Sequence, residues 1–178
     1  MRTRAIARRF REVWFVGLAL ALGPAVCVAD GSSFSERKQA SQVLEASGVK
    51  GGLVVHLGCG DGKLTAALHA NDSYLVHGLD AEPDNVERGR EHVRSRGVYG
   101  RVSVELLSRD RLPYTDNLVN LVVSENLGKV SMDEVMRVLC PNGVACIKRN
   151  GKWTKTVKPR PKDIDEWTHF LHGPDNNA

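Results

Sequence analysis

Apolar residues form five short runs between residues 33 and 149, separated by stretches with helical spacing. Most of the runs are continuous rather than alternating, as in strands that are buried on both faces of a sheet. They predict strands at 52–58, 74–80, 101–107 and 118–126, and a turn and strand at 141–149. Apolar positions three and four residues apart predict helices at 33–48, 63–70, 82–97 and 131–140.

Turn and capping residues support these boundaries. Gly48 and Gly97 follow two of the predicted helices, where a glycine commonly ends a helix. Ser131 and Glu134 have the spacing of a capping box at the start of another helix. Strands and helices alternate throughout, which favours a parallel sheet with helices on both faces. We therefore expect an α/β fold, with a Rossmann-like doubly wound, mostly parallel sheet of about five strands, whose ligands lie at the strand carboxyl ends.

The first 29 residues stand apart from this pattern. Five arginines and one glutamate precede an apolar run over residues 13–26, and small residues follow it up to Ala29. This arrangement predicts a secretory signal peptide at 1–29, with an uncleaved membrane anchor as the alternative. We expect an exported, periplasmic or extracytoplasmic protein that meets the membrane only through this segment.

The charge and the cysteines exclude several classes of function. Residues 1–29 carry the whole formal net charge of +4, because the rest has 20 basic and 20 acidic residues. The pI near 9.0 is therefore no indication of nucleic-acid binding. Cys59, Cys140 and Cys146 remain after the signal, an odd number that predicts neither a disulfide framework nor a zinc site. We expect small buried thiols and no metal site, although Cys140 and Cys146 could pair in an oxidising compartment.

A glycine-rich turn, VVHLGCGDGKL at residues 54–64, follows the first predicted strand. Its glycines are spaced G-x-G-x-G, since Lys63 stands where a dinucleotide-binding G-x-G-x-x-G turn needs its third glycine. The spacing disfavours a nicotinamide-dependent oxidoreductase, and the phosphate-loop pattern does not fit either. The turn nevertheless predicts a place where the backbone approaches a ligand closely.

Residues 33–149 resemble a class I S-adenosylmethionine-dependent methyltransferase of the type 11/25-like domain group. Four motifs carry the resemblance in order: the glycine turn and residues 76–93, 108–126 and 135–147. The resemblance implies S-adenosylmethionine as cofactor and methyl transfer to a small-molecule or protein acceptor that the sequence does not identify. The last two strands of the full methyltransferase fold are not recognisable after residue 149.

The resemblance also implies the site. The glycine turn would hold the amino-acid end of the cofactor, and Asp80 would accept hydrogen bonds from the ribose hydroxyls; capping of the next helix is the alternative for Asp80. The expected cofactor-binding residues are His56, Gly58, Cys59, Gly60, Asp61, Gly62, Asp80, Ala81, Ser108, Arg109 and Ser124. Glu125 and His56 are the candidates for a catalytic base. The chain departs from the family pattern where His56 and Ser108 replace acids expected to contact the cofactor amino group and adenine.

Residues 151–178 predict a basic, extended linker that leads away from the domain at 30–150. Residues 158–178 are similar to the segment that precedes a β-propeller of the pyrroloquinoline-quinone type in exported planctomycete-type proteins, which implies a downstream propeller as a partner. An exported domain would have little access to S-adenosylmethionine, which is made in the cytoplasm. The sequence therefore leaves two functions open: an active methyltransferase, and an exported, catalytically degenerate binding or structural module of a propeller-type protein.

Overall fold

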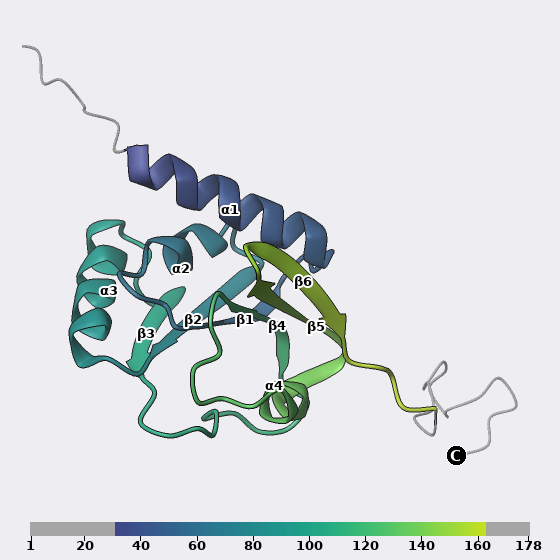
Figure 1. The fold of residues 1–178 in the computed structure, drawn as a ribbon. Helices are drawn as coiled ribbons and strands as arrows, with labels where there is room; N and C mark the ends of the chain where they lie inside the picture. Colours follow the sequence, from purple (N-terminus) through teal and green to yellow (C-terminus); the bar gives the residue numbers. More distant parts are fainter. Residues whose placement is uncertain (1–30, 163–178) are drawn as a thin grey trace, which may run out of the picture.

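The computed structural model describes residues 31–162, and its side chains are described from Phe34 onward (Figure 1). The predicted signal peptide and residues 163–178 of the predicted tail lie outside the described residues. The helices are α1 (Gly31–Ser47), α2 (Lys63–Leu68), α3 (Pro83–Ser95) and α4 (Met132–Val138). The strands are β1 (Gly52–Leu57), β2 (Tyr74–Asp80), β3 (Val102–Leu106), β4 (Val119–Ser124), β5 (Leu139–Arg149) and β6 (Lys152–Val157).

These strands form one sheet in the order β3-β2-β1-β4-β5-β6. Strands β1 to β5 run parallel, which confirms the predicted α/β fold of Rossmann-like type. The connections proceed outward in one direction from β1 to β3 and in the other direction from β4 onward. The carboxyl ends of β1 and β4 therefore flank a crevice, the usual ligand position in such a sheet.

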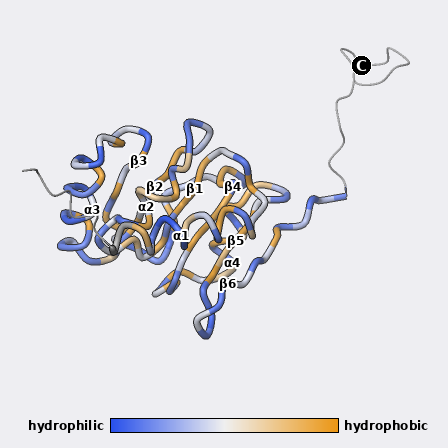
Figure 2. Tube along the Cα trace, turned by 90° about the horizontal axis from the view of Figure 1, so that it is seen from above, coloured by the Kyte–Doolittle hydropathy of each residue, from blue (hydrophilic) through white to orange (hydrophobic). Residues whose placement is uncertain are grey.

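The sheet is buried on both faces, because successive residues of β1 enter different hydrophobic cores. Val54 packs in the core under α1, α2 and α3, whereas Val55 packs in the core under α4. Figure 1 shows the first three helices together on one face, and Figure 2 shows hydrophobic positions following the strands. A strand with two buried faces needs apolar side chains at odd and even positions, which explains the nearly continuous apolar runs in the sequence.

Helix α1 covers one face with a stripe of buried residues. Ala40, Val43, Leu44 and Ser47 are buried and recur at the spacing of one helix face. The helix ends before Gly48, whose φ is +74° and whose amide donates to the Leu44 carbonyl at 3.1 Å, as the sequence predicts. Because α1 contacts α2, β5 and β6, it joins the two halves of the sheet on this face.

The region after residue 150 corrects the sequence prediction. A basic linker was expected from residue 151, but Lys152–Val157 form β6, which pairs antiparallel with β5. Trp153 packs against the core, and the Lys155 ammonium donates to the Ser47 carbonyl at 2.7 Å. An edge strand has one neighbour and mostly exposed side chains, so its lysine-rich sequence carries no apolar run. The sheet therefore has six strands within the described residues rather than about five.

The cysteines are free thiols in the described part of the chain. Cys59 and Cys146 are buried and Cys140 is partly buried, so the open alternative of a bond between Cys140 and Cys146 is not realised. Burial raises the pKa of the Cys59 thiol to about 12, which makes it a packing group rather than a nucleophile. Among residues 31–162, no helix combines the length and the apolar character that a bilayer crossing requires.

Gly62 connects the glycine turn to α2 where a side chain does not fit. Its φ is +76°, and a Cβ atom there would lie 2.8 Å from Cα and 3.0 Å from the carbonyl oxygen of Gly89 in α3. The last glycine of the turn therefore allows α2 and α3 to approach closely.

We expect Gly62→Ala to lower the free energy of unfolding by roughly 3 kcal/mol or more, because it combines a left-handed backbone with a backbone clash. Gly97→Ala is the matched control, since Gly97 has a φ of +68° and no atom within 4 Å of a built Cβ. It should cost only about 1–2 kcal/mol. Urea unfolding of both variants measures the difference, and equal losses would contradict the role of the Gly62–Gly89 contact.

Candidate functional site

Two clefts adjoin at Gly58, at the carboxyl ends of β1 and β4. The large cleft has a volume of about 920 Å³ and lies between the end of β2 and the loops after β3 and β4. The small cleft has a volume of about 210 Å³ and lies between the glycine turn, α1 and Glu125. Gly58 lines both, so the structure places open space on either side of the predicted turn.

Asp80 fastens the glycine turn to the end of β2. Its Oδ2 atom accepts a hydrogen bond from the Gly60 amide at 2.8 Å. Its Oδ1 atom accepts from the Glu82 amide and the Asn85 side chain, each at 3.0 Å. Asp80 is 6% exposed and lines the large cleft. The structure thus shows the helix-start contact that was the alternative role for this residue.

The three hydrogen bonds limit what else Asp80 can bind. A carboxylate offers about four acceptor positions, so roughly one remains for a ligand hydroxyl. A second position becomes available if the Asn85 amide turns away, which also requires the exposed Arg88 guanidinium that donates to Asn85 Oδ1 to move. Glu82 lines the same cleft and carries a further carboxylate two residues later. The end of β2 can therefore accept hydrogen bonds from two hydroxyls. Either Asp80 accepts both after Asn85 has moved, or Asp80 and Glu82 accept one each.

The loop after β3 forms the opposite wall of the large cleft, and α4 holds it in place. Ser108 and Arg109 line the cleft as predicted, together with Asp110. Arg137 of α4 donates to the carbonyls of Leu112 and Tyr114, at 3.3 and 3.0 Å, and pairs with Asp116 and Glu134. The hydrogen bond from Arg137 lowers the pKa of Glu134, which also accepts from the Leu112 amide at 2.7 Å. This network fixes the loop without using the residues that face the cleft.

His56 lies in β1 behind the small cleft and is 2% exposed. Its Nδ1 atom shares a hydrogen bond with the Thr65 hydroxyl at 2.8 Å, while its Nε2 atom is buried without a partner among the described residues. Burial lowers the pKa of His56 to about 4, against the opposing effects of Glu125 and Asp80. The ring is therefore neutral at physiological pH and carries no charge for a ligand.

Glu125 follows β4 and faces the small cleft beside His56. Its Oε1 atom accepts from the Gln39 amide at 2.6 Å and from the Lys148 ammonium at 2.5 Å. The hydrogen bond from Lys148 lowers the pKa of Glu125 more than burial raises it. A carboxylate held in its charged form is a weak base, so this position is better suited to binding a cation than to removing a proton.

Glu36 is a site residue that the sequence analysis missed. It lines the small cleft from α1, and its Oε2 atom is buried without a hydrogen-bond partner in the described part of the chain. Glu36 lies four residues before Ala40 and so extends the buried stripe of α1 by one turn. Polar residues at the end of an otherwise buried stripe are the signal that could have indicated it.

The structure brings most of the predicted residues together. His56, Gly58, Cys59, Gly60 and Asp61 line the small cleft, and Gly58, Asp80, Ala81, Ser108 and Arg109 line the large one. Ser124 does not line either cleft: it is fully buried and donates to the Leu57 carbonyl at 3.0 Å, joining β4 to β1. Gly62 contacts α3 instead of a cleft. A sequence motif places these two residues near the ligand but does not show which way they face.

Sequence comparisons identify related proteins. The family model described as a methyltransferase domain matches residues 54–143. Methyltransferase GfsG from Streptomyces halstedii is 33% identical over 96 residues, which cover 51% of this chain and 34% of that protein. The ubiquinone/menaquinone biosynthesis C-methyltransferase UbiE from Hydrogenovibrio crunogenus is 29% identical over 130 residues, covering 68% of this chain and 51% of that protein. The chain thus spans about half or less of the length of these curated relatives.

Solved structures share the fold. A SAM-dependent methyltransferase from Aquifex aeolicus gives a TM-score of 0.56 at 23% identity, covering 66% of each chain. Geranyl diphosphate C-methyltransferase from Streptomyces coelicolor A3(2), solved with Mg²⁺, geranyl diphosphate and S-adenosyl-L-homocysteine, gives 0.57 at 20% identity. It covers 63% of this chain and 45% of that one. At these identities the likeness establishes the α/β fold and says nothing about the acceptor.

The buried state of His56 predicts a pH-dependent stability. The unfolded ring, with a pKa of 6.5, takes up a proton that the folded ring resists until about pH 4. Stability should therefore fall as the pH drops from 6.5 towards 4, by at most roughly 3 kcal/mol from this residue. Urea unfolding of wild type and His56→Gln over this range measures the effect. The variant should lose less stability on acidification, and parallel pH profiles of the two proteins would contradict the prediction.

Proposed function

The chain belongs to the methyltransferase domain family, and from that premise we propose that it binds S-adenosylmethionine across the two clefts and transfers the methyl group. S-adenosylmethionine is the cofactor that the family and the fold neighbours support. The observation that carries the proposal is a pair of buried atoms without partners, His56 Nε2 and Glu36 Oε2, whose residues line one small cleft. Such atoms are uncommon in folded proteins, and these two can accept hydrogen bonds from a ligand that donates them.

The large cleft fits the adenosyl part of this cofactor. Asp80 and Glu82 present carboxylates to the ribose hydroxyls at the end of β2. Leu79, Leu107 and Leu127 add apolar surface to the same cleft, which suits the faces of a planar base. Ser108 and Asp110 stand at its wall and offer a hydroxyl and a carboxylate to the base edge. The chain therefore supplies both the polar and the apolar contacts that an adenosine requires.

The small cleft fits the amino-acid part. A neutral His56 whose Nδ1–H donates to Thr65 leaves Nε2 free to accept from an ammonium group. Glu36 and Glu125 line the same cleft and supply the negative charge that His56 lacks. We therefore infer that acids from α1 and from the end of β4 take over the role of the acid that the family pattern expects within β1.

The main task of the protein in this reaction is to align the acceptor with the methyl group of the cofactor. The sulfonium of S-adenosylmethionine supplies an electrophilic methyl group, so an acceptor held in line with it needs little further activation. His56, with a pKa of about 4, and Glu125, with a lowered pKa, are both poor bases at neutral pH. Asn126, Gly128 and Lys129 line the large cleft after β4 and provide the wall on the acceptor side. The acceptor is a small molecule or a protein that already carries a nucleophilic atom.

The lack of a suitable base at His56 and Glu125 also favours a second function, a module that binds the cofactor or a related molecule without turnover. This proposal includes export through residues 1–29 and attachment to a downstream propeller, both inferred from sequence outside the described residues. Cell fractionation with sequencing of the amino terminus tests export. Formation of S-adenosylhomocysteine in the presence of candidate acceptors separates the two functions, because a binding module forms none.

Calorimetric titration tests the cofactor proposal directly. We expect saturable binding of S-adenosylmethionine and of its demethylated product S-adenosylhomocysteine to the full chain. Asp80→Asn should weaken both by about ten-fold or more, because a charged acceptor is lost at the ribose. Circular dichroism of this variant checks that the start of α3 persists without the Asp80 contacts. Absence of binding to wild type at millimolar ligand would refute the proposal.

A second titration tests the charge supplied by α1. Glu36→Gln should weaken S-adenosylmethionine binding about ten-fold, because a hydrogen bond to a charged partner contributes roughly 1.5–3 kcal/mol. Binding of 5′-methylthioadenosine, which lacks the amino group, should be unchanged. Glu45→Gln is the matched control, since Glu45 is an exposed acid of the same helix outside both clefts. Equal losses for the two ligands would contradict ammonium binding by Glu36.

A further inference from the structure

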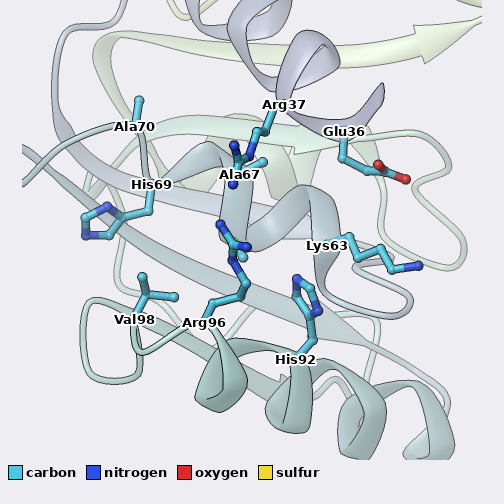
Figure 3. Close-up of a pocket in the computed structure, with 10 residues that line it drawn as sticks. Glu36, Arg37, Lys63, Ala67, His69, Ala70, His92, Arg96 and Val98 are labelled. Carbon is cyan, nitrogen blue, oxygen red and sulfur yellow. The ribbon is translucent and has the colours of Figure 1, made fainter. Parts of the chain in front are cut away.

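A third cavity lies between α1, α2 and α3, away from the strand ends (Figure 3). Its volume is about 310 Å³, within the range of small-molecule sites. Three of its lining residues are arginine or histidine side chains that have no part in the proposed methyl transfer: Arg37, His69 and Arg96. We call this cavity the basic pocket.

Two guanidinium groups face each other in the basic pocket. Figure 3 shows Arg37 reaching down from α1 and Arg96 reaching up from the end of α3, with Ala67 of α2 between them. Neither side chain has a hydrogen bond or ion pair among the described residues. Both arginines are exposed, so water weakens the repulsion between their like charges, and an anion bound between them would turn it into attraction. The arrangement is therefore favourable when a ligand supplies negative charge.

The nearby acid does not neutralise this pair. Glu36 lines the edge of the pocket, but in Figure 3 its carboxylate extends away from both guanidinium groups. Glu36 also lines the small cleft, as does His56. Lys63 also points away in the figure and pairs with Asp61 at 3.0 Å. The centre of the basic pocket therefore keeps the positive charge of the two arginines.

The floor of the pocket leaves room for a compact group. α2 and the residues after it contribute three small side chains, Ala66, Ala67 and Ala70. His69 flanks this floor, and its Nε2 atom is buried without a partner among residues 34–162. An imidazole nitrogen there can donate or accept one further hydrogen bond. The pocket thus combines two guanidinium groups with a floor of small side chains between them, and His69 lies at its side.

We propose that the basic pocket binds a small ligand through a phosphate or diphosphate group. The planar guanidinium fork matches two oxygens of a phosphate, and two forks on opposite sides can hold one such group. His69 lines the same pocket, but in Figure 3 its ring points away from the two guanidinium groups, so the arginines are the proposed ligands of the phosphate. The basic pocket adjoins the small cofactor cleft at Glu36, but its two arginines line neither cofactor cleft, so the proposal does not depend on methyl transfer.

Inorganic pyrophosphate is the probe, added to the full chain at constant ionic strength so that general salt effects cancel. We expect saturable binding by calorimetry and, in amide NMR spectra, shifts at Ala67 and Ala70 larger than those at the glycine turn. Arg37→Gln combined with Arg96→Gln should weaken binding at least ten-fold. The matched control, Lys38→Gln combined with Lys152→Gln, removes the same charge from exposed positions outside the pocket and should change binding less than two-fold.

Three outcomes would overturn the proposal. Non-saturable binding to wild type would show only general attraction to anions. Equal weakening in the arginine pair and in the lysine control would show that the pocket is not the site. Tighter binding of malonate than of pyrophosphate would assign the pocket to dicarboxylates instead of phosphates. Thermal unfolding of both double variants checks that they fold, so a loss of binding is not a loss of structure. Because the probe is added without S-adenosylmethionine, the result does not depend on whether that cofactor binds.

Discussion

The hydrogen bond from the Gly60 amide to the Asp80 carboxylate is the contact on which the site depends. It joins the turn after β1 to the end of β2, and the same carboxylate holds the first turn of α3 through Glu82 and Asn85. A charged acceptor makes this bond stronger than a bond between neutral groups. The glycine turn, the end of the sheet and α3 thus share one anchor. This hydrogen bond also positions both clefts, because Gly58, which lines both of them, belongs to the same glycine turn.

Most of the fold was predictable because its strands are buried on two faces and therefore appear in the sequence as apolar runs. The start of α4 was predictable for a local reason, since the Ser131 hydroxyl accepts from the Glu134 amide as the capping pattern indicates. β6 was not predictable in this way, because it has one neighbouring strand and its only partly buried side chain is Trp153. Its stability comes from pairing with β5, a non-local property that no short window of sequence shows.

The site residues also fall into those that local sequence predicts and those that depend on non-local packing. Motif spacing located the turn and Asp80, because their roles rest on the backbone and on the end of a strand. It could not locate Glu36 or Gln39, which reach the small cleft only through the docking of α1 on α2. It also placed Ser124 at the ligand, whereas the hydroxyl is used within the sheet. The Ser124 hydroxyl is used by the neighbouring strand β1. The sequence of β4 alone does not show which strand lies beside it, so this contact could not be predicted.

The path of β6 has a consequence for how this domain can be joined to others. β6 returns the chain to the amino ends of the parallel strands, where the Lys158 amide donates to Gly143 and its ammonium donates to Leu139. The clefts lie at the opposite ends of those strands. A domain fused after residue 162 would thus start from the side remote from the clefts and leave their openings accessible. A tether or domain joined ahead of α1 would instead start close to Glu36, and it would restrict the directions from which an acceptor can approach.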